Sequence, residues 1–265
     1  MLIGYGNLAL TPAVDGAAAV NLAALVDGHP ARVARIMGGV GSVRLRLDWS
    51  GPADIRIVAV LGITCPAGTS TVLTGKRAGD SGYARALGGN TDLQEVVSLP
   101  DGSRAAWFVL DEGIEPLVGL QLEVMAGAFD VGEFVVLQGV ELGHQTEWSV
   151  ERIDPSLRER TLGSGVNVVL RRTYRKLQMT FTPLALAEMR GQGLANGMDL
   201  DALGYAVTGG TRVAAIPRWS LQGGVVDVTE LHRTAIYGQA APGQASHLGG
   251  NYYSSGWAFE EIPPL

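Results

Sequence analysis

The stretch Val43–Trp49, with the sequence VRLRLDW, alternates apolar and charged residues without interruption. Successive side chains of an extended strand point to opposite faces, so one face of this segment is apolar and the other is charged. Leu120–Val124, Leu177–Phe181 and Trp257–Phe259 repeat the alternation. The pattern predicts antiparallel sheets that turn one face to a core and the other to solvent.

Two other runs, Ile55–Ile63 and Phe134–Leu142, are apolar on both faces and are predicted to be central strands. Clusters of glycine, proline, aspartate and serine separate the runs, as tight turns require. We therefore predict an all-β, mainly antiparallel fold of the sandwich or barrel type. The remaining expected strands are Trp107–Leu110, Val166–Leu170, Arg212–Ile216 and Leu231–Tyr237.

Helix signals are few. Thr182-Pro183 is suited to begin a helix over Leu184–Arg190, with Gly191 to end it. Single helical turns are expected at Asp199–Leu203 and at Asn21–Leu25. The sequence thus predicts one short helix in the second half of the chain.

A change of pattern near residue 150 predicts two domains. The polar segment Glu151–Ser156 contains a proline and is suited to be a connector. We expect a β-sandwich over residues 1–148 and a second β-rich domain with one short helix over residues 149–265.

The charge balance argues against nucleic-acid binding. The net charge is −6 and only 17% of the residues are charged, so the chain as a whole does not attract a polyanion. Basic residues gather only between Arg158 and Lys176, where acidic residues interrupt them and aromatic residues are not interleaved. The cluster is instead predicted to be a solvated strand face or a set of salt bridges to a neighbouring subunit, with Arg171 and Arg172 as candidate contact residues.

The residues that usually carry chemistry do not form a recognisable motif. Gly79–Gly82 resembles the nucleophile loop of serine peptidases, but the chain before it is too short for that fold and offers only His29 as a base. The single cysteine, Cys65, provides no disulfide framework, and dispersed histidines do not predict a metal site. We expect a non-enzyme without catalytic residues, metal or cofactor; the four histidines are His29, His144, His232 and His247, and His232 is expected to point outward from a strand.

Aromatic residues offer the one hint of a binding surface. Trp49 and Trp257 fall on apolar faces and are predicted to be core residues. Tyr252 and Tyr253 follow a glycine-rich segment and are the candidates for an exposed contact, with either a protein or a sugar. Apolar runs too short to cross a bilayer predict no membrane insertion, and the absence of a signal-peptide pattern predicts synthesis in the cytoplasm.

With this pattern assembled, the sequence resembles minor tail and tail-tip structural proteins of tailed bacteriophages. The resemblance rests on spacing and residue type in three regions. These are Asn21–Leu22 with Pro30–Ile36; Phe129–Phe134 leading to Trp148, Asp154–Ser156 and Gly163–Arg175; and Tyr252–Glu261.

The resemblance implies a galactose-binding-like N-terminal sandwich and an assembly domain, in a subunit of the virion tail that is made in the bacterial host. Its partners would be other copies of itself and neighbouring phage tail proteins. The alternative is a carbohydrate-binding module that recognises a glycan on the host surface. A glycan- or peptide-cleaving enzyme on a β-sandwich is the third hypothesis.

Overall fold

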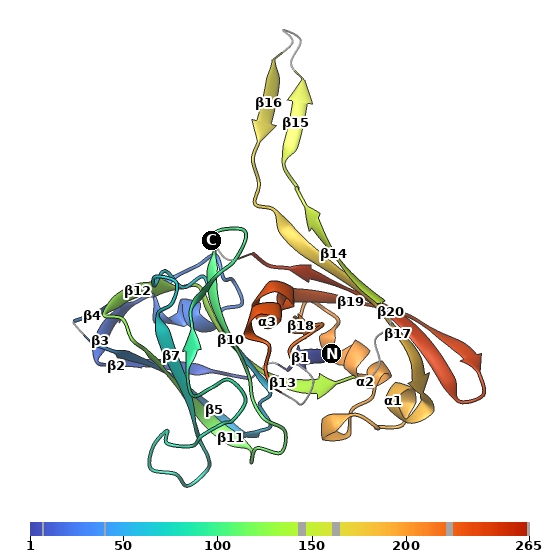
Figure 1. Ribbon diagram of the computed structural model, residues 1–265, viewed down its shortest axis with the longest axis horizontal. Helices are drawn as coiled ribbons and strands as arrows, with labels where there is room; N and C mark the ends of the chain where they lie inside the picture. Colours follow the sequence, from blue (N-terminus) through green and yellow to red (C-terminus); the bar gives the residue numbers. More distant parts are fainter. Residues whose placement is uncertain (7, 40, 143–146, 161–164, 221–224, 264–265) are drawn as a thin grey trace.

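The computed structural model describes residues 1–6, 8–39, 41–142, 147–160, 165–220 and 225–263. The fold is all-β and mainly antiparallel, as the alternating sequence predicts (Figure 1). The strands up to residue 142 are β1 (Leu2–Tyr5), β2 (Thr11–Asp15), β3 (Ala17–Val20), β4 (Ala34–Gly38), β5 (Val43–Ala53), β6 (Ile57–Leu61), β7 (Ser70–Lys76), β8 (Gln94–Glu95), β9 (Val97–Ser98), β10 (Arg104–Val109), β11 (Leu117–Val124), β12 (Ala128–Val131) and β13 (Glu133–Glu141).

The rest of the chain adds strands and three short α-helices among its described residues. The strands are β14 (Glu147–Ile153), β15 (Leu157–Arg160), β16 (Val166–Val169), β17 (Tyr174–Ala185), β18 (Arg212–Ile216), β19 (Ile236–Gly249) and β20 (Tyr252–Glu261). The helices are α1 (Leu186–Arg190), α2 (Leu200–Val207) and α3 (Val228–Thr234), and the 3₁₀ turns are η1 (Leu22–Val26) and η2 (Ala195–Gly197). Both of the shorter helical turns expected from the sequence are present, as η1 and as the start of α2.

A sandwich forms in the first half of the chain. Its outer layer is a sheet in the order β2-β5-β11-β7-β8. The apolar face of β5, which carries Leu45 and Leu47, packs in one core with Val58 and Val60 of β6 and with Phe134 of β13. The apolar face of Val43–Trp49, predicted from the alternation of its residues, is therefore part of the buried face of this sandwich.

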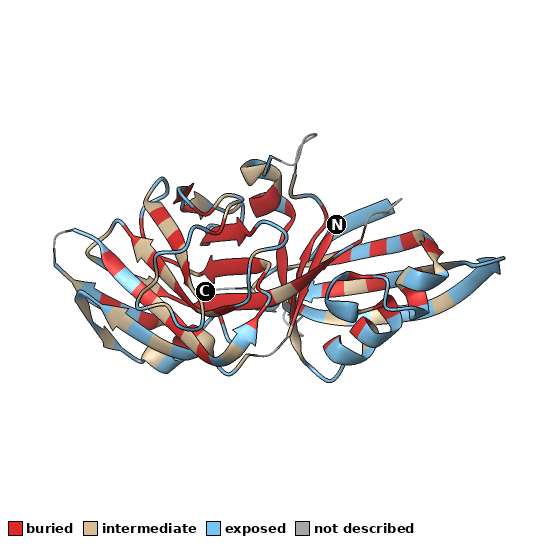
Figure 2. Ribbon diagram, turned by 90° about the horizontal axis from the view of Figure 1, so that it is seen from below, coloured by how far each residue is buried: buried red, intermediate tan, exposed pale blue. Residues whose placement is uncertain are grey.

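The central strand β6 is buried on both faces because it lies between two apolar clusters. Val58 and Val60 point into the sandwich, while Ile57, Ala59 and Leu61 contact a second cluster that includes Leu231 of α3. Figure 2 shows the buried residues concentrated in these inner strands. This arrangement confirms the prediction drawn from the unbroken apolar run.

One large sheet links the two halves of the chain. Its order is β14-β17-β20-β19-β18-β1-β13-β6-β10-β9. Strand β1 lies in its middle and pairs with β13 on one side and with β18 on the other. The sheet is thus continuous across the expected division at residues 148 and 149, which falls inside β14, and the division stays a prediction.

A third apolar cluster fills the space between this sheet and the helices α1 and α2. Phe181 of β17 and Trp257 of β20 meet edge to face with ring centres 6.1 Å apart, and Leu203 of α2 packs in the same cluster. Trp49 is buried in the sandwich core and Trp257 in this one, as predicted. Both tryptophans are core residues.

Two predicted elements differ from the structure. The helix expected over Leu184–Arg190 begins at Leu186, because Leu184 still pairs with Tyr253 of β20 as part of β17. The Glu188 carboxylate then accepts a hydrogen bond from the Ala185 backbone N–H and caps the helix.

The strand expected over Leu231–Tyr237 is also wrong in its first half. Residues up to Thr234 belong to α3, and only Ile236 onward is strand. Asp227 caps α3 by accepting a hydrogen bond from the Glu230 N–H, at 3.1 Å. The buried residues Leu231 and Ala235 are four positions apart, a spacing that suits one helix face as well as two points on a strand.

His232 consequently lies in the core and not on an outward strand face. Its Nδ1 is 2.8 Å from the Val228 carbonyl, and its Nε2 accepts a hydrogen bond from the Trp107 backbone N–H at 3.1 Å. This arrangement requires a neutral ring with the proton on Nδ1. Burial lowers the pKa of His232 below its usual 6.5.

Because the folded-state pKa of His232 is lowered, the unfolded chain takes up a proton at this residue before the folded chain does as pH falls. We expect the contribution of His232 to the free energy of unfolding to decrease as pH falls below about 6.5, the usual histidine value. Urea titrations of the wild type and of His232→Gln across pH 5–8 isolate this contribution, because the variant keeps an acceptor but cannot titrate at this position. The free energy of unfolding of the wild type, relative to that of the variant, should decrease as pH falls; a constant difference would contradict the assignment.

Candidate assembly arm

The most exposed part of the structure is a two-stranded ribbon that projects from the body (Figure 1). We define the arm as residues 154–173, of which 154–160 and 165–173 are described. Its strands β15 and β16 pair in the register Leu157↔Val169 to Arg160↔Val166. The arm continues the longer hairpin of β14 and β17, which places it beyond the edge of the large sheet.

The arm exposes apolar side chains that a folded monomer normally covers. Val166 is 58% exposed and Leu170 is 81% exposed. An isolated two-stranded hairpin is only marginally stable in water and normally needs a surface to pack against. The exposed large apolar residues of the arm are Leu157, Val166, Val168, Val169 and Leu170.

The register gives the two faces of the arm different characters. On one face each valine lies opposite an arginine, in the pairs Arg158↔Val168 and Arg160↔Val166. The other face carries Leu157 opposite Val169 and then a polar pair. Long arginine side chains can lie along apolar surface while the guanidinium stays in water, so the first face suits a partner that is apolar with acidic margins.

Hydrogen bonds of side chains link the two chain segments that connect β15 and β16 to the body. The Ser156 hydroxyl oxygen accepts from the Arg171 N–H at 3.0 Å, and Asp154 accepts from the Ser156 N–H at 3.0 Å. Asp154 also pairs with Arg158 at 3.1 Å. The Ser156 hydrogen bonds lower the pKa of Asp154, which keeps this carboxylate charged.

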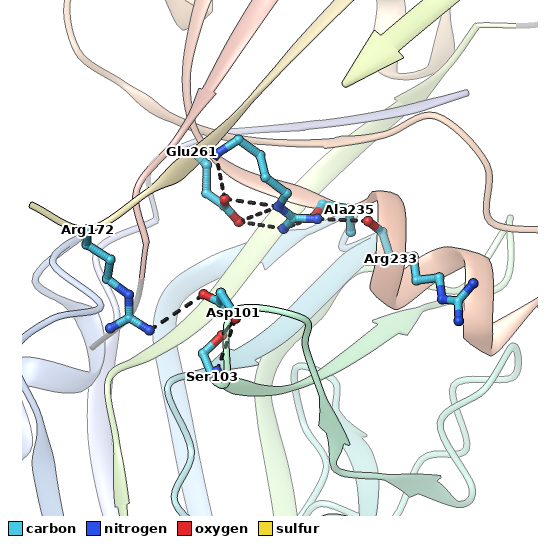
Figure 3. Close-up of polar contacts among 7 residues, drawn as sticks. Asp101, Ser103, Arg172, Arg233, Ala235 and Glu261 are labelled. Atoms are coloured by element: carbon cyan, nitrogen blue, oxygen red, sulfur yellow. Dashed lines mark hydrogen bonds and ion pairs between the residues drawn. The ribbon is translucent and has the colours of Figure 1, made fainter. Parts of the chain in front are cut away.

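Arg175 fixes the root of the arm to the body (Figure 3). Its Nε donates to Glu261 at 2.9 Å, and its terminal nitrogens donate to the carbonyls of Arg233 and Ala235, each at 2.8 Å. Both charged side chains are largely buried, at 19% and 12% exposed. One guanidinium thereby ties the start of β17 to β20 and to the end of α3.

Arg172, one of the predicted contact residues, lies at the root and faces the sandwich. Its guanidinium is 3.5 Å from the Asp101 carboxylate, and Asp101 is held by the N–H and hydroxyl of Ser103 (Figure 3). Arg171 lies one residue farther into the arm, where its backbone bonds to Ser156 and its side chain is exposed. The two arginines are therefore neighbours with different surroundings.

The predicted tyrosine pair lies far from the arm in the fold, at the start of β20. Tyr252 is exposed, whereas Tyr253 is half-buried between His247, with ring centres 5.1 Å apart, and the Arg190 guanidinium, 5.8 Å from the ring centre. The structure thus brings Arg171 and Arg172 together and keeps both away from the tyrosines. Whether any of the four contacts a partner stays a prediction.

Sequence reasoning identified the arginines but missed the apolar character of the arm and the role of Arg175. The run Val166–Leu170 has the composition of a strand inside the body, so its exposure was not expected. A usable signal was the sequence around this run: charged residues lie on both sides of it, and Leu157–Arg160, the nearest segment that could pair with it, is mostly charged.

The other sites considered from the sequence offer little chemistry. Cys65 is buried, and burial raises the pKa of its thiol to about 11, so it is a poor nucleophile. No three histidine, cysteine or acidic side chains of the described chain are arranged to hold a metal ion, and His144 lies outside that part. No helix in the described ranges is long and apolar enough to cross a membrane.

Removal of the Arg175 guanidinium should be costly, because Glu261 would keep a largely buried charge without its partner. We expect Arg175→Met to lower the free energy of unfolding by about 3–5 kcal/mol. Arg172→Met is the matched control: its pair with Asp101 is longer and more solvated, and we expect a change below about 1 kcal/mol. Denaturant titrations of both variants measure the difference, and similar losses would contradict the role given to Arg175.

Comparisons with known proteins do not assign this chain to a family. No protein-family model, curated protein sequence or solved structure matches it. The resemblance to phage tail proteins therefore stays a prediction, and a function has to be argued from the geometry of the arm.

Proposed function

We propose that this protein is a structural subunit that assembles with further copies of itself through the arm. The exposed apolar ribbon is the observation that carries the proposal. A partner that covers Val166 and Val168, on the face that also carries Arg158 and Arg160, would gain on the order of 25 cal/mol for each Å² of apolar surface removed from water. The clamped root of the arm supports the same role, because a fixed projection loses less freedom on binding than a loose one.

Charge favours a second copy as the partner. The arm has four arginines and two acidic residues, a net charge of +2, in a chain whose net charge is −6. The rest of each copy therefore carries −8, so the arm of one subunit is attracted to the body of another. Arg158 and Arg160 lie beside the valines and would set the register of such a contact.

The large sheet offers a second surface for the same assembly. Its order ends at β14, whose residues are exposed or nearly so. The edge strand of a sheet presents unpaired backbone groups to which another strand can add. A neighbouring subunit could thus pair with β14 while it covers the arm.

The biological setting that fits this design is the tail of a bacteriophage virion. The proposal joins the sequence resemblance to minor tail and tail-tip proteins with an arm that suits repeated contacts between identical subunits. In a ring or cluster, each arm would reach one neighbour and each body would receive one arm. The protein would then act through assembly and not through catalysis.

The test is the mass of the purified protein in solution. We expect light scattering to show oligomers, or a stable complex with neighbouring tail proteins. The double variant Val166→Ser/Val168→Ser should dissociate more easily, by at least about tenfold in concentration, since it removes two apolar contacts from one face of the arm. Thermal unfolding of the variant at low concentration shows whether the body is intact.

Tyr205→Ser provides the matched control, because Tyr205 is an exposed large side chain on α2, away from the arm, and is 79% exposed. Its mass distribution should equal that of the wild type. A wild-type protein that stays monomeric alone and with its genomic neighbours would refute the proposal and favour the carbohydrate-binding alternative.

A further inference from the structure

A cavity of about 290 Å³ lies where the sandwich meets the second half of the chain. It is lined by Gly6, Leu8 and Leu10 after β1, by the end of η1 and the loop after it, by β13, by the segment that leads from α2 into β18, and by the start of β19. Its polar lining residues are Asp27, Glu133, Thr211, Arg212 and Tyr237. None of the residues that line this cavity belongs to the arm or to β14, so the proposed assembly does not involve it.

Glu133 is the unusual residue of the cavity. Its side chain is almost completely buried, with only 4% of the residue exposed. Its Oε1 accepts a hydrogen bond from the Gly28 N–H at 3.1 Å, but its Oε2 has no hydrogen-bond partner among the described residues. A buried polar atom without a partner is costly, so native proteins rarely keep one unless something else satisfies it.

The protonation state of Glu133 determines whether its Oε2 acts as a hydrogen-bond donor or as an acceptor. Burial, with a smaller contribution from nearby Asp27, raises the pKa of Glu133 to about 8 against the lowering effects of the Gly28 hydrogen bond, the His29 backbone N–H and Arg212. The carboxyl is therefore mostly protonated at neutral pH. Because Oε1 already accepts from Gly28, Oε2 carries the proton and is a donor; once ionised, it is an acceptor.

The cavity is lined by charged residues of both signs, which disfavours a charged ligand relative to a neutral one. Arg212 lines the wall and donates through Nε to the Gly28 carbonyl at 3.1 Å, so an organic cation would face its guanidinium. Asp27 lies on the same wall, where it accepts from the His29 N–H and from Arg32, so an anion would face a carboxylate. A hydroxyl group can accept a hydrogen bond from Arg212 and donate one to Asp27. It can also accept from the protonated form of Glu133 or donate to the ionised form.

We propose that this cavity binds a small neutral polyhydroxylated molecule, of monosaccharide size or smaller, with Glu133 and Arg212 as its hydrogen-bonding residues. The volume is near the lower end of ligand pockets, about 300–1,000 Å³. Apolar side chains such as Leu8, Leu10 and Leu137 line the remainder and can contact the carbon atoms of the ligand. This inference is independent of the proposed assembly, since none of these residues belongs to the arm.

The experiment is a titration of the ¹⁵N-labelled full chain followed by NMR. Glycerol, D-galactose and myo-inositol are the neutral probes, and methylammonium and acetate are the charged probes. We expect at least one neutral probe to shift the Gly28 and Arg212 amide signals in a saturable way, while the charged probes do not. A lack of saturable shifts with all three neutral probes, or saturation by a charged probe, would overturn the proposal.

Two variants of Glu133 separate binding from a purely structural role. Glu133→Gln keeps a donor and an acceptor, so its affinity for the responsive probe should stay within about threefold of the wild type. Glu133→Met has similar length without either function and should weaken binding by about tenfold or more, as expected for the loss of a buried hydrogen bond.

If Glu133→Met does not fold, Arg212→Met tests the second proposed hydrogen-bonding residue. This variant should also weaken binding by about tenfold or more. The arm variant Val166→Ser/Val168→Ser should bind the probe like the wild type, so a failure of assembly and a failure of the cavity proposal give different results. Unchanged affinity in Glu133→Met or in Arg212→Met would refute the assigned contacts.

Discussion

The pairing of β1 with both β13 and β18 is the constraint on which the rest of the structure depends. Strand β1 has only a few residues, yet it joins strands from both halves into one sheet. Gly4 makes the fit possible: a Cβ there would lie 2.9 Å from methyl groups of Ile57 and Leu137, closer than packed side chains allow. The second and third apolar clusters, which both include residues of β1, thereby share a rigid wall. The positions of the strands at the ends of the sheet depend on this wall.

The arm shows how a rigid body can support an exposed projection. Strands β14 and β17 extend past the sheet, and the buried Arg175–Glu261 pair fixes the point where β17 leaves it. Beyond that point the described residues of the arm make few contacts with the body. Because the root of the arm is fixed, its apolar and basic ribbon would be presented in the same position in every copy of the subunit.

Two buried titratable residues, His232 and Glu133, differ in whether their polar atoms have hydrogen-bond partners. His232 satisfies both ring nitrogens with backbone groups, so its neutral form is complete and it serves the core. Glu133 satisfies only one carboxyl oxygen with a hydrogen bond and lies beside a cavity, so its other oxygen has no hydrogen-bond partner among the described residues. The complete hydrogen bonding of His232 fits a role in stability, whereas the free oxygen of Glu133 supports the proposed ligand binding.

The sequence by itself determined the all-β class, the buried faces of β5 and β11, and the two-sided burial of β6, because periodicity is a local record of which faces are covered. It did not determine that β1 is central, that His232 lies on a helix, or that Val166–Val169 is exposed. Nor did it indicate that Gly28, Glu133 and Arg212 meet around a cavity. Each of these depends on pairing between residues distant in the chain, and apolar residues at the spacing of Leu231 and Ala235 fit a helix or a strand until their neighbours are in place.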